Sequence, residues 1–216
     1  MVNAVTDWLD DRLGVREFWR KQAAHPVGKH VNYLYCFGGL TFFFFAMQVL
    51  TGALLAVYYV PTPAEAHASV EYIQTEVSYG WLIRGLHHWG SSGMVVMIGI
   101  HMLRVFFTGA YKPPRELNWV IGVVLLAVTL VFSFTGYLLP WDQKAYWATQ
   151  VGTAIAGVAP VVGEFILRVV RGGAELSGVT LSRFFAIHVL ILPGVTVLFM
   201  LAHFIMIRKQ GISGPL

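Results

Sequence analysis

Four apolar runs, each long enough to cross a lipid bilayer, constrain the fold of this chain more than any other feature. A helix needs about 20 apolar residues to cross a hydrocarbon core of about 30 Å, and within lipid its backbone must satisfy its own hydrogen bonds. Hydrophobic residues make up 56% of the 216 residues and charged residues only 12%, which is more apolar than a soluble domain tolerates. The sequence therefore predicts an all-α membrane protein, a single domain of residues 1–216 containing a transmembrane four-helix bundle. The expected spans are Tyr33–Tyr59, Ile83–Phe107, Leu117–Leu138 and Phe184–Ile207.

Two segments outside the spans have helical patterns of their own. Residues 1–30 interleave apolar and charged residues and contain no apolar core or small-residue cleavage site of a signal peptide. This pattern predicts an N-terminal amphipathic helix in a cytoplasmic interfacial segment. The connection from Pro140 to Arg183 mixes aromatic residues with short apolar runs of helical period, which predicts one or two surface helices between the third and fourth spans.

The basic residues between the spans predict the orientation of the chain. Three groups of them precede the first span, lie between the second and third spans, and follow the fourth span. With four spans, these three groups fall on one face. The positive-inside rule makes that face cytoplasmic and places both termini inside. The loop from Val60 to Trp81 has three Glu and no Lys or Arg, as expected for the outer face. The net charge of +4 is explained by topology, and we expect no nucleic-acid partner.

Two spans each carry two histidines on one helical face. In an α-helix, His87 and His101 are 14 residues apart, which corresponds to about 40° in angle and ~21 Å in height. His188 and His203 are 15 apart, or about 60° and ~22 Å, again on one broad face. His88 lies about 140° from His101 and is therefore expected to be an ordinary polar residue near the outer interface.

The matched depths predict two facing histidine pairs, one in each leaflet. Because both helices begin at the outer face, His87 should face His188 outside and His101 should face His203 inside. Two neutral imidazoles on opposite helices are the axial ligand set of a b-type haem in a bundle core. Zinc would require further ligands, and no carboxylate or Cys accompanies either pair. A proton pathway or a structural polar network remains the alternative explanation.

Glycines in the other two spans repeat the same spacing. Gly38 and Gly52 are 14 residues apart, as are Gly122 and Gly136. Glycine often serves only for close helix packing in membranes, but two pairs at this separation favour clearance for the edges of two haems.

Several long motifs make the chain resemble a known family. The segments "HVNYLYCFGGLTF", "SYGWLIRGLHHW", "KPPRELNWVIGVVL", "FTGYLLPWDQKAYWAT" and "HFIMIRKQGISGPL" are similar to the cytochrome b6 type of the cytochrome b family. The details "GLHHWG", "FFTGAYKPPRELNW" and "RFFAIHV" are most similar to the b subunits of menaquinol:cytochrome c reductases of Gram-positive bacteria. The resemblance extends from about His30 to Leu216.

The resemblance implies cofactors and residues that would hold them. It implies two b haems, with His87 and His188 on the outer iron and His101 and His203 on the inner iron. It implies that Cys36, the one cysteine of the chain, forms a thioether to an additional covalent haem c on the cytoplasmic side. It also implies that arginines near the span ends pair with haem propionates, although these arginines have topology or snorkelling as an alternative role. These are Arg84 and Arg183 at the outer haem and, with weaker support, Arg104 and Arg115.

The resemblance also implies two quinone sites. The loop "GYLLPWDQKAYW" forms one wall of an outer quinol site in the family, so Tyr137, Trp141 and Tyr146 are candidate contacts. Arg208 matches a basic residue near the inner quinone site, but Lys21 stands where a carboxylate is expected, which puts that proton route in doubt.

The same comparison implies a set of partners. The Pro-Glu-Trp-Tyr motif of the family is missing from the chain, which implies a separate smaller subunit that carries this motif. A Rieske iron–sulfur protein, a c-type cytochrome, quinol and quinone, membrane lipid and a second copy of the complex are the other implied partners.

The implied activity is that of the di-haem subunit of a quinol:cytochrome c oxidoreductase in a bacterial cell membrane. Electrons from quinol oxidised at the outer face would cross to quinone at the cytoplasmic face and contribute to a proton gradient. Three alternatives remain: a photosynthetic cytochrome b6 that uses plastoquinol, a di-haem anchor of another membrane dehydrogenase or a hydrogenase, and a membrane scaffold or transporter subunit without redox function.

Overall fold

The computed structural model describes residues 2–24, 29 and 31–213, and the regular structure of these residues is helical. Four helical segments are long and apolar enough to cross a membrane, which confirms the four expected spans. They are Tyr33–Ala56, Gly80–Phe107, Glu116–Leu138 and Gly178–Gln210. The first consists of a 3₁₀ turn, Tyr33–Cys36, and α3, Phe37–Ala56; the next two are α5, Gly80–Phe107, and α6, Glu116–Leu138; the fourth contains α9, Gly178–Ala186, and α10, Leu192–Gln210.

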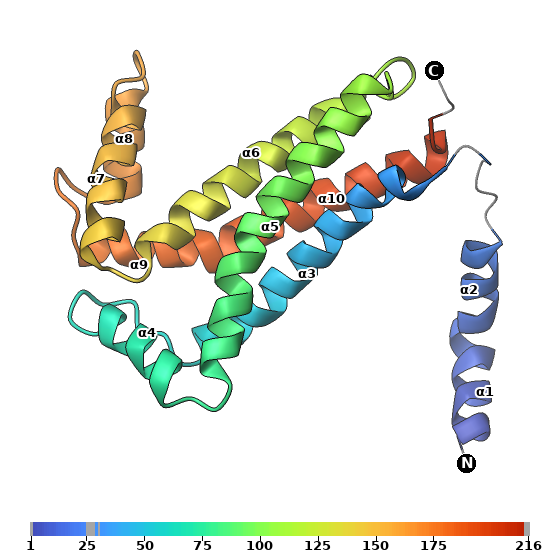
Figure 1. Cartoon of the computed structure of the whole chain (residues 1–216), viewed down its shortest axis with the longest axis horizontal. Helices are drawn as coiled ribbons and strands as arrows, with labels where there is room; N and C mark the ends of the chain where they lie inside the picture. The colour runs from blue at the N-terminus through green and yellow to red at the C-terminus, as the bar shows by residue number, and fades with distance from the viewer. Residues whose placement is uncertain (1, 25–28, 30, 214–216) are drawn as a thin grey trace.

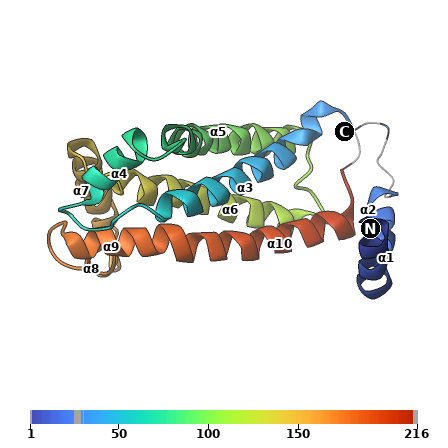
Figure 2. The ribbon, with the colours of Figure 1, turned by 90° about the horizontal axis from the view of Figure 1, so that it is seen from below.

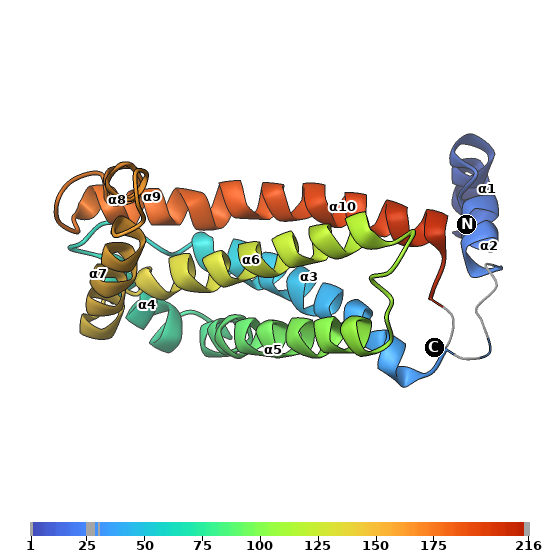
Figure 3. The same cartoon turned by 90° about the horizontal axis from the view of Figure 1, so that it is seen from above.

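The four spans form a bundle in which the two histidine-bearing helices lie on opposite sides. Figures 2 and 3 show α5 and α10 at the two edges, with α3 and α6 between them. α3 packs closely along α5 and α6 packs along α10, whereas α5 and α10 do not pack closely against each other. At Gly93 of α5, an added Cβ would lie 2.8 Å from the Phe44 ring of α3, so glycine permits this close approach. The histidine helices are therefore held apart by their neighbours.

A small apolar cluster divides the bundle into two levels. Phe45, Met94 and Ile98 are buried at its centre and pack against partly buried residues of α6 and α10. Met94 and Ile98 lie between His87 and His101 in the chain, so this cluster separates the two histidine levels.

The two ends of the bundle differ in structure. At one end, which we call the loop end, α4 (Ala66–Thr75), α7 (Gln143–Gly157), α8 (Gly163–Arg171) and the start of α9 lie together (Figure 1). Ala66, Leu138, Leu181 and Phe184 are fully buried there and join α4, α6 and α9. The other end, which we call the terminal end, has α1 and α2, the connection between α5 and α6, and the end of α10 beside it (Figure 1).

The connecting helices confirm the expectation for the third loop and add a helix to the first. α7 and α8 are the expected surface helices, and the Asp142 side chain caps α7 by accepting the Ala145 N–H at 2.7 Å. Arg171 at the end of α8 is only 4% exposed and donates to Thr153 Oγ1 and the Gln150 carbonyl of α7. α4 was not expected, because its ten residues are a short helix in a loop rich in Pro and Glu.

The N-terminal segment forms two short helices where one was expected. α1, Val2–Leu13, and α2, Val15–Ala23, meet at Gly14, whose φ of +60° breaks the helix. Large apolar side chains such as Trp8 and Trp19 are more than half exposed. Residues 1, 25–28 and 30 of the expected 1–30 segment lie outside the described residues.

The fourth span contains a π-helical turn at Ile187–Ile191. Such a turn inserts one extra residue into an α-helix. The 15 residues between His188 and His203 therefore turn the helix by about as much as 14 residues of regular α-helix, close to 40°. The structure thus corrects the 60° expected for a straight helix and gives both histidine helices the same angular offset.

Candidate functional site

His87 of α5 and His188 of the fourth span face each other near the loop end. Their ring centroids are 6.3 Å apart and the ring planes differ by 71°. Two metal–imidazole bonds of about 2.0–2.1 Å in line would place the ring centres roughly 6 Å apart. The helices α5 and α10 do not pack closely against each other, so there is room between the two imidazoles. The residues present therefore fit an iron atom held between these two rings.

A threonine from a neighbouring helix fixes each of these rings. Thr51 Oγ1 of α3 lies 2.9 Å from His87 Nδ1, and Thr135 Oγ1 of α6 lies 3.0 Å from His188 Nδ1. Each hydroxyl donates its hydrogen to a backbone carbonyl of its own helix, at 2.7 Å for Thr51 and 2.9 Å for Thr135. The hydroxyl oxygen must therefore accept the Nδ1–H, which leaves Nε2 as the lone-pair donor for a metal.

The four predicted glycines lie against the four histidine rings. A Cβ at Gly38 would lie 3.1 Å from His101 Cε1, and one at Gly52 would lie 3.1 Å from His87 Cε1. On α6, a Cβ at Gly136 would lie 2.7 Å from His188 Cε1, and one at Gly122 would lie 3.9 Å from His203 Cε1. The structure brings together each glycine and one imidazole, so the role of glycine includes making room for the ring itself.

His101 and His203 occupy the corresponding level near the terminal end. The two rings lie within electrostatic range of each other. No hydrogen bond of normal geometry reaches His203 Nδ1 among the described residues, although the Asn118 backbone lies close enough to interact with it. This level thus lacks the threonine clamps of the other one.

The four candidate arginines differ in how well their N–H groups are satisfied. At the loop end, Arg84 donates to Gln74 Oε1 at 2.9 Å, and Arg183 donates to the carbonyls of Arg168 and Val169. At the terminal end, Arg104 has two buried nitrogens and Arg115 has one without a hydrogen-bond partner among the described residues. The Arg104 guanidinium also lies over the Tyr35 ring, 3.5 Å from its centroid. The unsatisfied arginine donors are therefore at the terminal end. The sequence had favoured Arg84 and Arg183, at the loop end, as partners of haem propionates.

The remaining candidates at the terminal end are exposed. Cys36 is a free, exposed cysteine at the start of α3, two residues before the glycine that contacts His101. Arg208 is exposed in the last turn of α10. Lys21 forms an ion pair with Glu17 at 2.7 Å on the exposed surface of α2. At the other end, near the start of α5, His88 is exposed and packs edge-on against Trp89.

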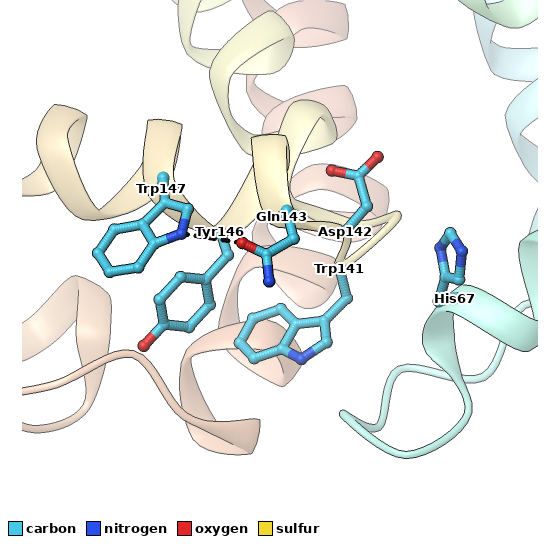
Figure 4. A pocket seen from close by; sticks show the side chains of 6 residues that line it. All are labelled: His67, Trp141, Asp142, Gln143, Tyr146 and Trp147. Atoms are coloured by element: carbon cyan, nitrogen blue, oxygen red, sulfur yellow. Dashed lines mark hydrogen bonds between the residues drawn. The ribbon is translucent and has the colours of Figure 1, made fainter.

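A cavity of about 540 Å³ opens at the loop end (Figure 4). Two of the three candidate quinol contacts, Trp141 and Tyr146, line it, and their rings meet edge to face at 5.6 Å. Tyr137 is not among the lining residues and is 52% exposed on α6. The complete lining is His67, Trp141, Asp142, Gln143, Tyr146 and Trp147.

The backbone at Trp141 is strained. Its φ of +51° lies in the left-handed region, where a bulky side chain is seldom found. The turn that requires this conformation ends α6 and begins α7, and it points the indole at the cavity (Figure 4). Strain of this kind is concentrated at functional sites, where the surrounding structure maintains it.

Sequence reasoning missed Thr51, Thr135 and His67. A signal for the threonines was present, because the dipeptide Thr-Gly occurs at 51–52 and again at 135–136, at the same level of two different spans. No local pattern marks His67, since the cavity forms only when α4 meets the turn before α7.

The fold and this arrangement define a class of protein: a membrane-embedded four-helix bundle with two levels of facing imidazoles. The family described as Cytochrome b/b6/petB matches residues 22–211. The chain belongs to the cytochrome b/b6 family, and membership implies two b haems.

Individual relatives agree with this family over the full chain. The chain is 53% identical over 224 residues to the menaquinol:cytochrome c reductase cytochrome b subunit of Bacillus subtilis (strain 168), with 100% of both chains covered. It is 49% identical over 215 residues to the cytochrome b6 of Porphyra purpurea, again with 100% of both covered. A solved structure of a hyperthermophilic respiratory Complex III matches 97% of the chain with a TM-score of 0.90 and 36% identity. The chain spans 56% of the length of that structure's chain.

Proposed function

We propose that the chain is the di-haem cytochrome b subunit of a menaquinol:cytochrome c reductase. The facing pair His87–His188, with both rings fixed through Nδ1, is the observation that most strongly supports this function. The full-length similarity to reductase subunits supports the choice of menaquinol as substrate. Quinol oxidation would occur at the loop end and quinone reduction at the terminal end.

His87 and His188 would hold one haem iron, and His101 and His203 the other. A b haem supplies a reversible one-electron iron couple. The chain's own residues would determine where these groups sit. Thr51 and Thr135 orient two rings, and the glycines lie against all four, with close approaches at Gly38, Gly52 and Gly136 and an ordinary contact at Gly122. Phe45, Met94 and Ile98 separate the two levels. Gly38, Gly52, Gly122 and Gly136 therefore belong to the proposed haem sites.

The ligand assignment is tested by removing one imidazole at a time from the purified complex. His188→Ala should remove only the haem at the loop end, and His203→Ala only the one at the terminal end, each halving the haem b content per polypeptide. His88→Ala is the matched control and should retain both. A redox titration identifies which haem each variant has lost. If His188→Ala and His203→Ala lost the same haem, the pairing would be wrong.

Arg104 and Arg115 are proposed to bind the carboxylates of the haem at the terminal end. Their unpartnered buried nitrogens support this assignment, because a buried N–H group without an acceptor is costly and a carboxylate accepts two N–H bonds at once. Arg115 also donates from its other side to the Gln210 carbonyl at 3.2 Å. Arg84 and Arg183 are proposed to bind the carboxylates of the haem at the loop end. To do so, Arg84 would have to leave the Gln74 amide and Arg183 its carbonyl partners.

Cys36 is proposed to carry a covalent haem c at the terminal end. Its exposed thiol lies two residues from Gly38, which contacts His101, and this proximity supports the assignment. The thiol S–H would add across one vinyl group, forming a C–S bond and placing the hydrogen on the other vinyl carbon. A haem-staining band should remain with the polypeptide after acidified-acetone extraction and disappear in Cys36→Ser. Absence of the band from the wild-type protein would refute the attachment.

The quinone sites are assigned to the two ends of the bundle. Trp141 and Tyr146 would contact quinol in the cavity of Figure 4. Tyr137 stays a candidate contact, although it is not among the residues that line the cavity. Arg208 is exposed at the terminal end, as required for contact with quinone there. Residue 21 is a lysine paired with Glu17, so this position has no carboxylate to deliver protons to that site. Identification of the quinone that co-purifies with the complex would separate menaquinol from plastoquinol as the substrate.

The partners and orientation follow from the same proposal. The complex would contain a smaller subunit with the Pro-Glu-Trp-Tyr motif, a Rieske protein and a c-type cytochrome, and it would be a homodimer in the bacterial cell membrane. Both termini would be cytoplasmic, because most of the Lys and Arg residues lie at the terminal end. Mass identification of co-eluting subunits tests the partners.

A further inference from the structure

The cavity at the loop end contains a histidine that neither the motifs nor the proposed function assigns. His67 lies in the first turn of α4 and forms the wall opposite the aromatic residues of the turn before α7 (Figure 4). Trp141 and Tyr146 provide flat apolar surfaces, so a planar aromatic ring fits between them and His67.

The first turn of α4 is held firmly enough to fix the position of this imidazole. Ala66 is completely buried in the cluster with Leu138 and Phe184. Ser69 Oγ donates to the Ala66 carbonyl at 2.8 Å and accepts the Val60 N–H at 3.2 Å. His67 therefore extends from a fixed backbone, although its own side chain is exposed.

The hydrogen bond made by His67 determines which ring nitrogen can act as a base. Nδ1 lies 3.3 Å from the Pro140 carbonyl, and a carbonyl can only accept, so Nδ1 carries the hydrogen. Nε2 is then the nitrogen with the lone pair.

Two other polar side chains of the cavity lining take part in hydrogen bonds. Asp142 accepts the Ala145 N–H at 2.7 Å as the cap of α7. Gln143 Oε1 accepts the Trp147 indole N–H at 3.1 Å, the dashed line in Figure 4. An imidazole is a stronger base than a carboxylate or an amide, so His67 Nε2 is the strongest base that the lining offers to a bound hydroxyl group.

We propose that His67 is the proton acceptor for the aromatic diol that binds in this cavity, an inference that rests on the proposed quinol oxidation. The ligand's O–H bond breaks, an Nε2–H bond forms, and the ligand is left as the oxyanion from which an electron is more readily removed. The bond to the Pro140 carbonyl stabilises the resulting imidazolium, and exposure lets the proton pass to the outside water. No electron moves in this step.

The charged and titratable groups around His67 are compatible with this role. Glu65 and Glu71 lie on or beside α4, and Asp142 and Tyr146 belong to the cavity wall. Arg84 of α5, against which α4 packs, binds Gln74 near the far end of α4. The carboxylates are opposite in charge to the imidazolium that the proton transfer forms.

The test compares His67→Asn with the wild-type complex. The Asn amide N–H can replace the bond from Nδ1 to the Pro140 carbonyl, but Asn has no titrating base. With a short-chain menaquinol as substrate, we expect kcat to fall about 100-fold with little change in KM, and the acid-side limb of the pH–rate profile to disappear. His88→Asn, another exposed histidine at this end, is the control and should keep the wild-type profile.

Two further measurements separate proton transfer from a structural role. Free imidazole in the buffer should restore a large part of the rate to His67→Ala, because it supplies the missing base. The affinity of His67→Asn for an oxidised short-chain menaquinone, followed by tryptophan fluorescence quenching, should equal that of the wild type. A raised KM with unchanged kcat, an unchanged pH profile or a failure of imidazole to rescue would each overturn the inference. Absence of quinol oxidation in the wild-type complex would instead refute the proposed function.

Discussion

Gly136 and His188 form the closest of the four glycine–histidine contacts: a Cβ added at Gly136 would lie 2.7 Å from Cε1 of the imidazole. The equivalent distance from Gly122 to His203 is 3.9 Å, an ordinary van der Waals contact. The two glycines of α6 therefore differ in whether a side chain would fit there, although their positions in the sequence pattern are equivalent.

This difference predicts opposite results for two alanine substitutions on one helix. Gly136→Ala should displace the His188 ring and reduce occupancy of the haem site at the loop end, because a separation of 2.7 Å cannot be maintained. Gly122→Ala should retain full haem content. Its free energy of unfolding should rise by up to about 1 kcal/mol, because alanine has a higher helix propensity than glycine. The haem b content per polypeptide, with a redox titration to identify the site, provides the measurement. Equal haem content in the two variants would contradict the contact.

The threonine clamp predicts a site-specific loss of affinity. Thr135→Val has nearly the same shape but removes the acceptor for the His188 Nδ1–H, so haem binding at that level should weaken by about 10–100-fold. Thr129→Val is the control, because the Thr129 hydroxyl donates to the Leu125 carbonyl of its own helix and has no other hydrogen-bond partner among the described residues. Haem retention during dialysis against apomyoglobin compares the two variants. Identical retention would show that Thr135 does not orient the ligand.

The π-helical turn predicts that one residue can be removed from the fourth span. Deletion of Ile191 should convert Ile187–Ile191 to regular α-helix with a 14-residue spacing and preserve both haems. Deletion of Val95 in α5, which has no such turn, should rotate His87 against His101 by about 100° and abolish one haem site. Optical difference spectra of the two deletion variants check this expectation. Loss of a haem in both would mean that the turn does not absorb the extra residue.

Arg171 predicts a strong stability effect from a residue outside the haem sites. Arg171→Met leaves the Thr153 hydroxyl and the Gln150 and Ala174 carbonyls without their donor, at a cost of about 1–3 kcal/mol for each buried group that water cannot reach. Arg168→Met removes only an exposed ion pair with Glu164 and should cost less than about 1 kcal/mol. Protease sensitivity of α7 and α8 and the thermal midpoint of the complex distinguish the variants. A stable Arg171→Met protein would show that this arginine does not hold the two helices together.

Local periodicity was sufficient to predict much of the fold. Run length predicted the four spans to within a few residues, except at the start of the fourth, because crossing a bilayer sets a minimum apolar length. The face shared by His87 and His101 followed from helical geometry, and the motif resemblance identified the family that the comparisons confirm. α4 and the break at Gly14 were missed, since short helices and single left-handed residues leave little periodic signal.

The sequence by itself determined how many helices cross the membrane, which family the chain belongs to, and which histidines share a face. All three depend on residues close along one helix or on motifs read directly from the chain. Only the tertiary structure decided that Thr51 and Thr135 fix the imidazoles, that Arg104 and Arg115 have unsatisfied donors, and that His67 faces Trp141. The rotation of each helix about its axis and the partners of each polar group depend on packing between elements far apart in sequence. No periodicity within one helix specifies those contacts.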